Sequence, residues 1–248
     1  MNYSIVIPAK NEQEGLKELL PSLLKLHPNE IIIVNDGSTD NTELVCQDFG
    51  VTVINHAYSK GNGAAIKTGA RSAKSDFIVF MDADGQHKAS DVPMLLDELE
   101  NGYDLVVGAR GQDSQAGLLR GVGNRFYNWF SSLIVGHKIH DLTSGFRAVK
   151  REKFLEFLYL LPNGFSYPTT STMAFFRAGY SVKYIAIDMP KRLGSSHLSV
   201  FKDGIKFLLI IFKIGTLYSP LKIFFPIAVL HIFLGLSYYG YTFLTEGR

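Results

Sequence analysis

Two acidic residues directly follow a run of apolar residues in this chain. Residues 77–81 are all apolar, and Asp82 and Asp84 come next, two positions apart. Because residues two apart point to the same side of an extended chain, both carboxylates can face one ligand. Carboxylate oxygens suit Mg²⁺ or Mn²⁺, which take waters and substrate phosphates as their remaining ligands. The pattern predicts a divalent metal that holds a diphosphate, although Asp-Ala-Asp-Gly is also typical of a simple turn.

Two earlier predicted strands also end in polar loops. Lys10, Asn11 and Glu12 follow the first strand, and Asp36 lies at the tip of the second, where it could accept hydrogen bonds from a base or ribose. A turn with a helix cap at Asp40 is the alternative for the second loop. Open parallel sheets bind ligands outside the carboxyl ends of their strands. Three such loops at one sheet edge therefore predict a nucleotide site.

A glycine-rich segment, Lys60-Gly61-Asn62-Gly63-Ala64-Ala65, opens a predicted helix and suggests a phosphate cradle. It does not complete G-x-G-x-x-G, because Ile66 stands where the third glycine belongs, and it follows the third strand. The sequence also contains no Walker A motif. A dinucleotide-binding fold is therefore disfavoured.

These loops require a particular order of elements. Short runs rich in Ile and Val alternate with helical patterns through residue 110, which predicts an α/β fold with a mostly parallel, Rossmann-like sheet and helices on both faces. We expect Asn11 and Ser90 to cap the first and fourth helices. The predicted strands are 3–8, 30–35, 51–55, 77–81 and 104–108, and the predicted helices are 12–26, 42–49, 63–73 and 90–100.

The alternation ends after Arg110. Residues 111–117 are polar and contain glycine, which predicts a loop, and residues 118–135 form a predicted helix with interleaved basic and aromatic residues. Further strands are predicted over 144–149 and 180–189, and further helices over 153–160 and 169–178.

The last fifty residues are the most apolar part of the chain. Residues 199–216 predict an amphipathic interfacial helix with lysines among its apolar residues. Residues 221–244 contain a single formal charge, Lys222, and as a helix would span about 36 Å, enough to cross a bilayer. A buried core helix is the alternative. Lysines before this segment predict a cytoplasmic catalytic domain (1–198), a juxtamembrane helix (199–219) and a single-pass anchor (220–248).

Overall composition excludes few classes. Lys and Arg total 25 against 23 Asp and Glu, a balance that does not favour nucleic-acid binding. Cys46 is the sole cysteine, so no intrachain disulfide can form, and we expect it to be a small buried residue in a reducing compartment. The chain enters a strand pattern at once, which predicts no signal peptide.

Five motifs in order resemble the family 2 glycosyltransferases, and within them the polyprenyl-phosphate sugar synthases of the dolichol-phosphate mannose synthase type. The resemblance covers about residues 3–200 and implies the glycosyltransferase A-type fold. The motifs are Pro8-Ala9-Lys10-Asn11-Glu12, Val34-Asn35-Asp36-Gly37-Ser38-Thr39-Asp40, Lys60-Gly61-Asn62-Gly63-Ala64-Ala65, Asp82-Ala83-Asp84-Gly85-Gln86 and Asp141-Leu142-Thr143-Ser144-Gly145-Phe146-Arg147.

The resemblance implies roles for particular residues. Asp82, Ala83 and Asp84 would form the D-x-D site, with Asp82, Asp84 and Gln86 as the ligands of Mg²⁺ or Mn²⁺. Arg192-Leu193-Gly194-Ser195-Ser196-His197 resembles a loop that closes over the donor. The residues implied in binding the sugar nucleotide, besides the D-x-D site, are Pro8, Ala9, Asn11, Glu12, Asp36, Lys60 and Arg192.

The chemistry that this implies is transfer of a hexose with inversion at the anomeric carbon. A phosphate monoester acceptor is already a nucleophile at neutral pH and needs little help from a general base. Metal would neutralise the leaving diphosphate, and arginines would hold the two anionic substrates together. Asp84, Arg110 and Arg147 are the catalytic candidates. Arg120 and Arg125 are equally consistent with a solvated or membrane-facing helix surface.

Three functions remain open at this point. The first is a membrane-anchored transferase that moves mannose or glucose from a GDP- or UDP-sugar to dolichyl or undecaprenyl phosphate, with membrane lipid as a further partner and a homo-oligomer allowed. The second is a transferase to a lipid or glycan hydroxyl, which needs a base carboxylate. The third is a non-catalytic membrane adaptor that binds nucleotide sugars. The carboxylates available as a base are Asp113, Asp141, Glu152, Glu156 and Asp188.

Overall fold

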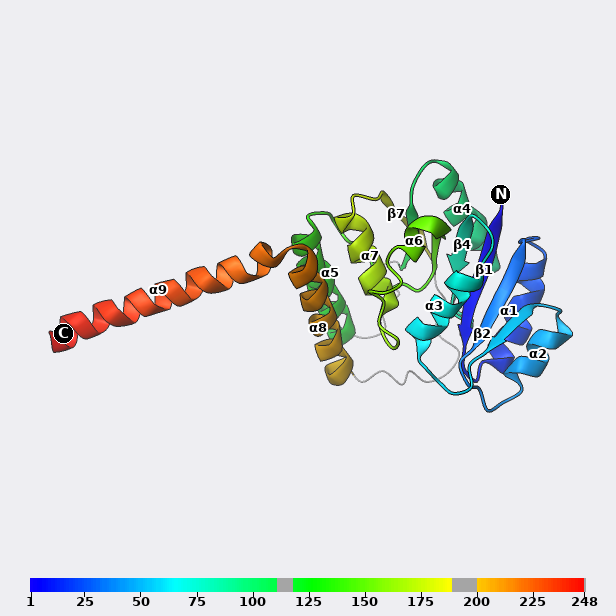
Figure 1. The fold of residues 1–248 in the computed structure, drawn as a ribbon, viewed down its shortest axis with the longest axis horizontal. Helices are drawn as coiled ribbons and strands as arrows, with labels where there is room; N and C mark the ends of the chain where they lie inside the picture. Colours follow the sequence, from blue (N-terminus) through cyan, green and yellow to red (C-terminus); the bar gives the residue numbers. More distant parts are fainter. Residues whose placement is uncertain (111–117, 189–199, 248) are drawn as a thin grey trace.

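The computed structural model describes residues 1–110, 118–188 and 200–247. Strands and helices alternate through the first 110 residues, as the sequence predicts (Figure 1). In chain order these elements are β1 (Tyr3–Ala9), α1 (Gln13–Leu24), β2 (Glu30–Asn35), α2 (Thr42–Asp48), β3 (Thr52–Asn55), α3 (Asn62–Ser72), β4 (Phe77–Phe80), the short 3₁₀ helix η1 (Ala89–Asp91), α4 (Val92–Glu100) and β5 (Leu105–Arg110).

The second part of the chain adds two strands and five helices within the described residues. The helix predicted over 118–135 has these same bounds, while the strand predicted over 144–149 is shorter. The elements are α5 (Leu118–Val135), β6 (Arg147–Lys150), α6 (Arg151–Leu155), α7 (Tyr167–Arg177), β7 (Val182–Ile187), α8 (Val200–Tyr218) and α9 (Pro220–Glu246).

One mixed sheet organises the domain. Its strand order is β3-β2-β1-β4-β6-β5-β7, and β6 is antiparallel to both of its neighbours while the other pairs are parallel. The parallel strands β1, β2 and β4 are adjacent, so their carboxyl ends form one edge. The predicted α/β class with a mostly parallel sheet is confirmed.

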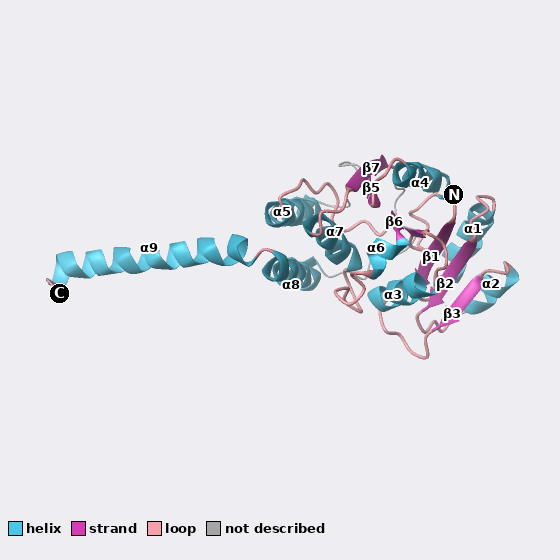
Figure 2. Ribbon diagram, turned by 45° about the horizontal axis from the view of Figure 1, so that its top comes forward, coloured by secondary structure: helices cyan, strands magenta, loops and turns pink. Residues whose placement is uncertain are grey.

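Helices cover both faces of the sheet because alternate strand residues point to opposite sides (Figure 2). Ile5 and Ile7 of β1 belong to a core with α1, α2 and α4, whereas Val6 belongs to a core with α3, α6 and α7. Cys46 is fully buried in the first of these cores, as predicted. Both faces therefore contribute to holding the strand ends, and the loops beyond them, in place.

Two predicted helix caps are wrong. Helix α1 begins at Gln13 with Glu12 at the N-cap position, and Asn11 adopts a φ of 57° just before it. Helix α4 begins at Val92, because residues 89–91 form the 3₁₀ turn and place Asp91, not Ser90, before the helix. In both cases the sequence contained a good capping residue, but the loop conformation placed another residue at the helix start.

Helices α5 and α8 form a third layer beside α7 (Figure 1). Phe207, Ile211 and Ile214 of α8 are buried, and the latter two pack with Ile134 of α5 and Met173 of α7. Other apolar residues of α8 stay exposed, so its apolar surface is divided between the protein and solvent. Helix α9 projects away from this layer (Figure 1) and, of the helices described, is the one long and apolar enough to cross a membrane.

Candidate active site

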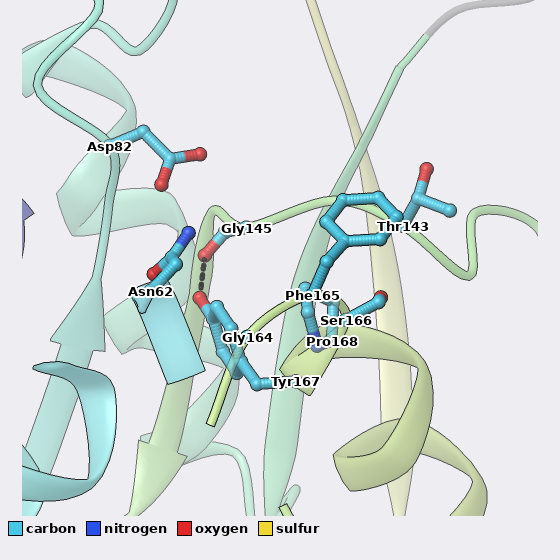
Figure 3. Close-up of a pocket in the computed structure, with 9 residues that line it drawn as sticks. All are labelled: Asn62, Asp82, Thr143, Gly145, Gly164, Phe165, Ser166, Tyr167 and Pro168. Atoms are coloured by element: carbon cyan, nitrogen blue, oxygen red, sulfur yellow. Dashed lines mark hydrogen bonds between the residues drawn. The ribbon is translucent and has the colours of Figure 1, made fainter. Parts of the chain in front are cut away.

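The Asp82–Asp84 loop lies where β4 ends, between α1 and the turn before β6. A Cβ added to Gly145 would stand 2.6 Å from Asp82 Oδ2, and one added to Gly15 would stand 1.9 Å from the Ala83 carbonyl oxygen. The two glycines therefore let the neighbouring backbones approach the acidic loop from both sides. The Tyr167 hydroxyl donates to the Gly145 carbonyl across 2.9 Å, which anchors the turn beneath Asp82 (Figure 3).

His87 also belongs to the site, although its position in the sequence predicted no role for it. The Asp82 backbone N–H donates to His87 Nδ1 across 3.0 Å, and the buried ring stacks on Phe146 at 5.0 Å. Burial lowers the pKa of His87 against the opposing charges of Asp82 and Asp84. A neutral ring whose Nδ1 accepts must carry its proton on Nε2. The sequence shows that His87 follows Asp82 by five residues, but this spacing does not indicate which group the ring contacts.

The acidic residues line two different hollows. Asp84 lines the first hollow with Asn11 and Glu12, which precede α1, and with Asp40, which precedes α2. Asp82 lines a second cavity with residues of α3, the turn before β6 and the segment that enters α7 (Figure 3). Its lining consists of Asn62, Asp82, Thr143, Gly145, Gly164, Phe165, Ser166, Tyr167 and Pro168.

The oxygen donors of the acidic loop are chemically suited to Mg²⁺ or Mn²⁺. Asp82 and Asp84 supply two carboxylates, and Gln86 supplies a side-chain amide oxygen. The backbone N–H of Gln86 donates to Asp84 Oδ1 across 3.2 Å. Within residues 1–110, 118–188 and 200–247, no group of three His, Cys, Asp or Glu side chains is placed to hold a metal. Such ions commonly bind one or two carboxylates and complete their shell with substrate phosphates, so the donor set fits.

Asp36 holds the glycine-rich loop instead of facing the site. Its Oδ1 lies 2.7 Å from His56 Nδ1 and accepts from the Lys60 N–H at 2.8 Å, while Oδ2 accepts from Ser59 Oγ and the Gly61 N–H, both at 2.8 Å. Burial opposes ionisation, but these bonds outweigh it and lower the pKa of Asp36 to about 2. With four partners the carboxylate has no acceptor position left, which corrects the expectation that it contacts a base or ribose.

The glycine-rich loop does not form the predicted phosphate cradle. The Lys60 and Gly61 amides are taken by Asp36, and those of Gly63 and Ala64 donate to the carbonyls of Gly164 and Asn163. These amides therefore join α3 to the segment before α7. The Lys60 side chain is exposed, with Nζ 5.7 Å from the Tyr58 ring centre.

The first two loops are tied to each other. The Asn11 side chain accepts from the Thr39 N–H at 2.8 Å, and the Ala9 carbonyl accepts from the Asp36 N–H at 2.8 Å. Asp40 accepts from the N–H groups of Gln13 and Thr42, the first residues of α1 and α2. Asp40 thus satisfies amides at two helix starts, although Asn41, and not Asp40 as predicted, occupies the N-cap position of α2.

Arg110 forms a bidentate pair with Asp141. Its Nε and one terminal nitrogen donate to the two Asp141 oxygens at 2.8 and 3.0 Å, and that nitrogen also contacts the Thr143 hydroxyl. Burial lowers the pKa of Arg110, but the bonds and charge of Asp141, with the charge of Asp82, raise it overall. Asp141 also accepts from the Thr143 and Ser144 amides, and these bonds fix the turn.

Arg147 lies beneath the site and not in it. The side chain is fully buried, and its guanidinium donates to the carbonyls of Ser144 and Pro168 and the hydroxyls of Ser171 and Thr172. The structure therefore corrects the expectation of a phosphate contact, because the group cannot reach an anion in the cavity from this position. Sequence alone does not distinguish a buried arginine at a strand start from an exposed one.

Four other basic residues considered from the sequence have no described contact with the site. Arg192 and His197 lie outside the described residues, as does the Arg120 side chain. Arg125 is exposed on α5.

A family model described as glycosyl transferase family 2 matches residues 4–158, more than half of the chain. The chain is a family 2 glycosyltransferase. A second model, described as the GtrB C-terminal hairpin, matches residues 219–248 of this glycosyltransferase.

Curated relatives extend the match beyond the family domain. The glycosyltransferase is 32% identical over 213 residues to polyprenol monophosphomannose synthase of Mycolicibacterium smegmatis, covering 79% of this chain and 80% of that protein. It is 29% identical over 226 residues to glycosyltransferase AglJ of Haloferax volcanii, covering 89% of this chain and 74% of that protein. It is also 32% identical to the dolichol-phosphate mannosyltransferase of Pyrococcus furiosus, over 66% of this chain and 50% of that protein.

Solved structures agree on the fold. Glucosyl-3-phosphoglycerate synthase from Mycobacterium tuberculosis, in complex with Mn²⁺, UDP-glucose and phosphoglyceric acid, superposes with a TM-score of 0.71 at 20% identity, covering 86% of this chain and 79% of that one. At this identity the likeness shows the glycosyltransferase A-type architecture of the domain.

Proposed function

We propose that this glycosyltransferase moves a hexose, mannose or glucose, from a GDP- or UDP-sugar to a polyprenyl phosphate such as dolichyl or undecaprenyl phosphate. The observation that carries the proposal is the cavity beside Asp82, whose lining contains no other carboxylate among the described residues. A hydroxyl acceptor needs a base at this position, whereas a phosphate monoester does not. The names of relatives from Mycolicibacterium and Pyrococcus, which include polyprenol and dolichol phosphate sugars, support the same acceptor class.

The carboxylates suggested as bases for a hydroxyl acceptor are engaged elsewhere. Asp141 is paired with Arg110, and Glu156 accepts from the Tyr180 hydroxyl. Glu152 lines a hollow with Lys74 and Asp76, away from the acidic loop, and Asp188 is 94% exposed beside Lys88. Asp113 lies outside the described residues. These positions disfavour the hydroxyl acceptor. The supported acidic loop equally disfavours a non-catalytic adaptor.

Different residues of the chain would bind the metal, the acceptor phosphate and the donor nucleotide. We propose that Asp82, Asp84 and Gln86 hold Mg²⁺ or Mn²⁺, which when bound supplies Lewis-acid neutralisation of the leaving diphosphate. Arg110, partly exposed and near Asp82, would position the acceptor phosphate, whose attack inverts the anomeric carbon. Pro8, Ala9, Asn11, Glu12 and Lys60 remain our candidates for the donor nucleotide, with Arg192 beyond the described residues.

We also propose that α9 anchors the enzyme by a single span with its catalytic domain in the cytoplasm. Helix α9 has 27 residues, nearly all exposed, and therefore reaches about 40 Å. Lys206, Lys213 and Lys222 precede or begin this helix, as the positive-inside rule requires of the cytoplasmic side. Removal of residues 220–248 should leave a protein that alkaline carbonate extracts from membranes, and resistance to this extraction would contradict the single span.

Transfer can be tested directly. Membranes that contain the chain are incubated with Mn²⁺, radiolabelled GDP-mannose or UDP-glucose, and undecaprenyl or dolichyl phosphate. We expect label in the lipid extract, and we expect Asp84→Ala to abolish it without altering the far-UV circular dichroism spectrum. Absence of lipid-linked label with every donor and acceptor pair would refute the proposed reaction.

A further inference from the structure

A phenylalanine stands at the edge of the cavity beside Asp82. Phe165 lines this cavity, and 38% of its surface is exposed. Figure 3 shows its ring beside Thr143, with Asp82 and Asn62 on the other side of the view. One wall of the cavity is therefore aromatic, and the opposite wall carries the acidic residue.

Phe165 connects this cavity to the C-terminal helices. Its ring meets Phe207 of α8 edge to face at 4.8 Å between centroids, and Phe207 stacks on Tyr127 of α5 at 5.5 Å. We call Phe165, Phe207 and Tyr127 the aromatic bridge. The three residues come from segments far apart in sequence, and together they make an uninterrupted aromatic contact from the cavity to the layer formed by α5 and α8.

Beyond the bridge, α5 and α8 present an exposed apolar face. Trp129 is 60% exposed and Leu209 is also 60% exposed, although both lie on helices whose other sides are packed. Exposed apolar residues recur on both helices at spacings of three and four, which places them along one stripe of each helix. The apolar face consists of Phe126, Trp129, Leu133, Ile205, Leu208, Leu209 and Phe212.

This apolar face continues into α9. Phe212 contacts Phe224 of α9 at 6.1 Å between ring centroids, and Lys222 donates to the carbonyls of Leu133 and Ile134 at the end of α5. The segment that can span a bilayer is thereby joined to the face (Figure 1). Large exposed apolar patches mark protein or membrane contacts, and continuity with α9 favours the membrane here.

We infer that the aromatic bridge holds the isoprenoid chain of the acceptor between the membrane-facing apolar face and the acidic loop. This inference rests on the proposed function, because it assumes an acceptor with a hydrocarbon tail and a phosphate head. The phosphate would lie in the cavity near Asp82, and the adjoining isoprene units would lie on the exposed side of Phe165, which the buried Phe207 supports from α8. The donor would then approach from the other side, where Asp84 lines the hollow with Asn11 and Glu12.

The arrangement explains two otherwise unconnected observations. A half-exposed Phe165 is unfavourable in water but becomes buried when a hydrocarbon chain lies on it. The bridge also gives a lipid tail a route to the cavity that avoids the charged residues around Asp84. Without the aromatic bridge, the apolar face would contact the membrane but would not be connected to the cavity.

Photolabelling tests the location of the tail. The full-length chain is placed in phosphatidylcholine nanodiscs with a polyprenyl phosphate that carries a diazirine on its second isoprene unit. We expect labelled peptides to contain Phe165, Phe207 or Tyr127, and excess unmodified polyprenyl phosphate to compete. A phosphatidylcholine with a diazirine in its acyl chain serves as the control and should label the outer face, near Trp129 and Leu209, without competition.

Kinetics of matched variants supply the second measurement. Phe165→Ala and Phe207→Leu should each lower kcat/KM for a long polyprenyl phosphate about tenfold, as expected for lost burial of part of one aromatic side chain. The KM for the sugar nucleotide should not change. Leu217→Ala, on the same helix but outside both the aromatic bridge and the apolar face, should stay within about twofold of the unmodified enzyme.

The two hypotheses fail in different ways. Bridge labelling without sugar transfer would support the tail path and refute the proposed reaction. Sugar transfer with labelling confined to α9 or the outer face would overturn the tail path and leave the reaction standing. Equal losses in the Phe207 and Leu217 variants would also overturn it, because the effect would then come from a general change in α8.

Discussion

The backbone N–H of Asp82 donates to His87 Nδ1 across 3.0 Å, so a buried histidine fixes the first acid of the D-x-D loop. The ring can do this only while Nδ1 has a lone pair, and its stack on Phe146 sets its orientation. The bond engages the Asp82 backbone and not its carboxylate. His87 is therefore a positioning residue for this loop.

Replacing His87 should weaken metal binding more than it weakens the fold. His87→Phe removes the acceptor for the Asp82 N–H, and outer partners of metal ligands are commonly worth about 10–100-fold in affinity. We expect a loss of this size in Mn²⁺ affinity, measured by calorimetry with nucleoside diphosphate present. His87→Asn keeps an acceptor oxygen and should recover part of the affinity. Equal affinities for His87→Phe and the unmodified chain would show that the bond has no positioning role.

Gly145→Ala should displace the Asp82 carboxylate. An added Cβ would lie 2.6 Å from Asp82 Oδ2, closer than such atoms can approach. Because misplacement of a site group by about 1 Å can cost about a hundredfold in rate, we expect a loss of that order in transfer. Gly164→Ala is the matched control, since its added Cβ meets no atom within 4 Å. Comparable activity in the two variants would contradict the close approach of Gly145 and Asp82.

Asp36 should make stability depend on pH at the acidic end. Its pKa falls from the ordinary 3.8 to about 2 in the folded chain, so its contribution is complete above pH 3.8 and is lost as pH falls through about 2. Asp36→Asn cannot accept all four hydrogen bonds and should lower stability at neutral pH by about 2 kcal/mol. Thermal melts followed by circular dichroism between these pH values test this. The variant should lack this part of the acid-induced loss, and an unchanged profile would refute it.

Arg147 and Arg110 should differ in what their replacement costs. Arg147→Met leaves the buried Ser144 carbonyl without its arginine donor and removes one of the donors to the Pro168 carbonyl, and we expect a loss of about 2–3 kcal/mol, or roughly 5–10 °C in Tm. Arg110→Lys keeps a charge but loses the bidentate pair with Asp141. Arg110→Lys should lower the transfer rate strongly and lower Tm only slightly. The reverse pattern, with Arg147→Met stable but inactive, would return Arg147 to the site.

Local patterns in the sequence determined the elements and the position of the acidic loop. Alternation of apolar runs and helical periods specified β1 to β5 and the bounds of α5, and Asp82 and Asp84 necessarily follow a buried strand. The long uncharged segment of α9 needed no tertiary information either. These features depend on residues within one or two turns of each other, and therefore periodicity alone reveals them.

Only the tertiary structure decided which groups face the site. Asp36, His56 and Gly61 are drawn together by packing of β2, β3 and α3, which turned a predicted ligand contact into an internal network. Arg147 became buried because β6 runs antiparallel between β4 and β5. Phe165 met Phe207 only through the packing of α8. Hydrogen-bond and aromatic partners so distant in sequence leave no periodic trace, because their choice depends on how whole elements pack.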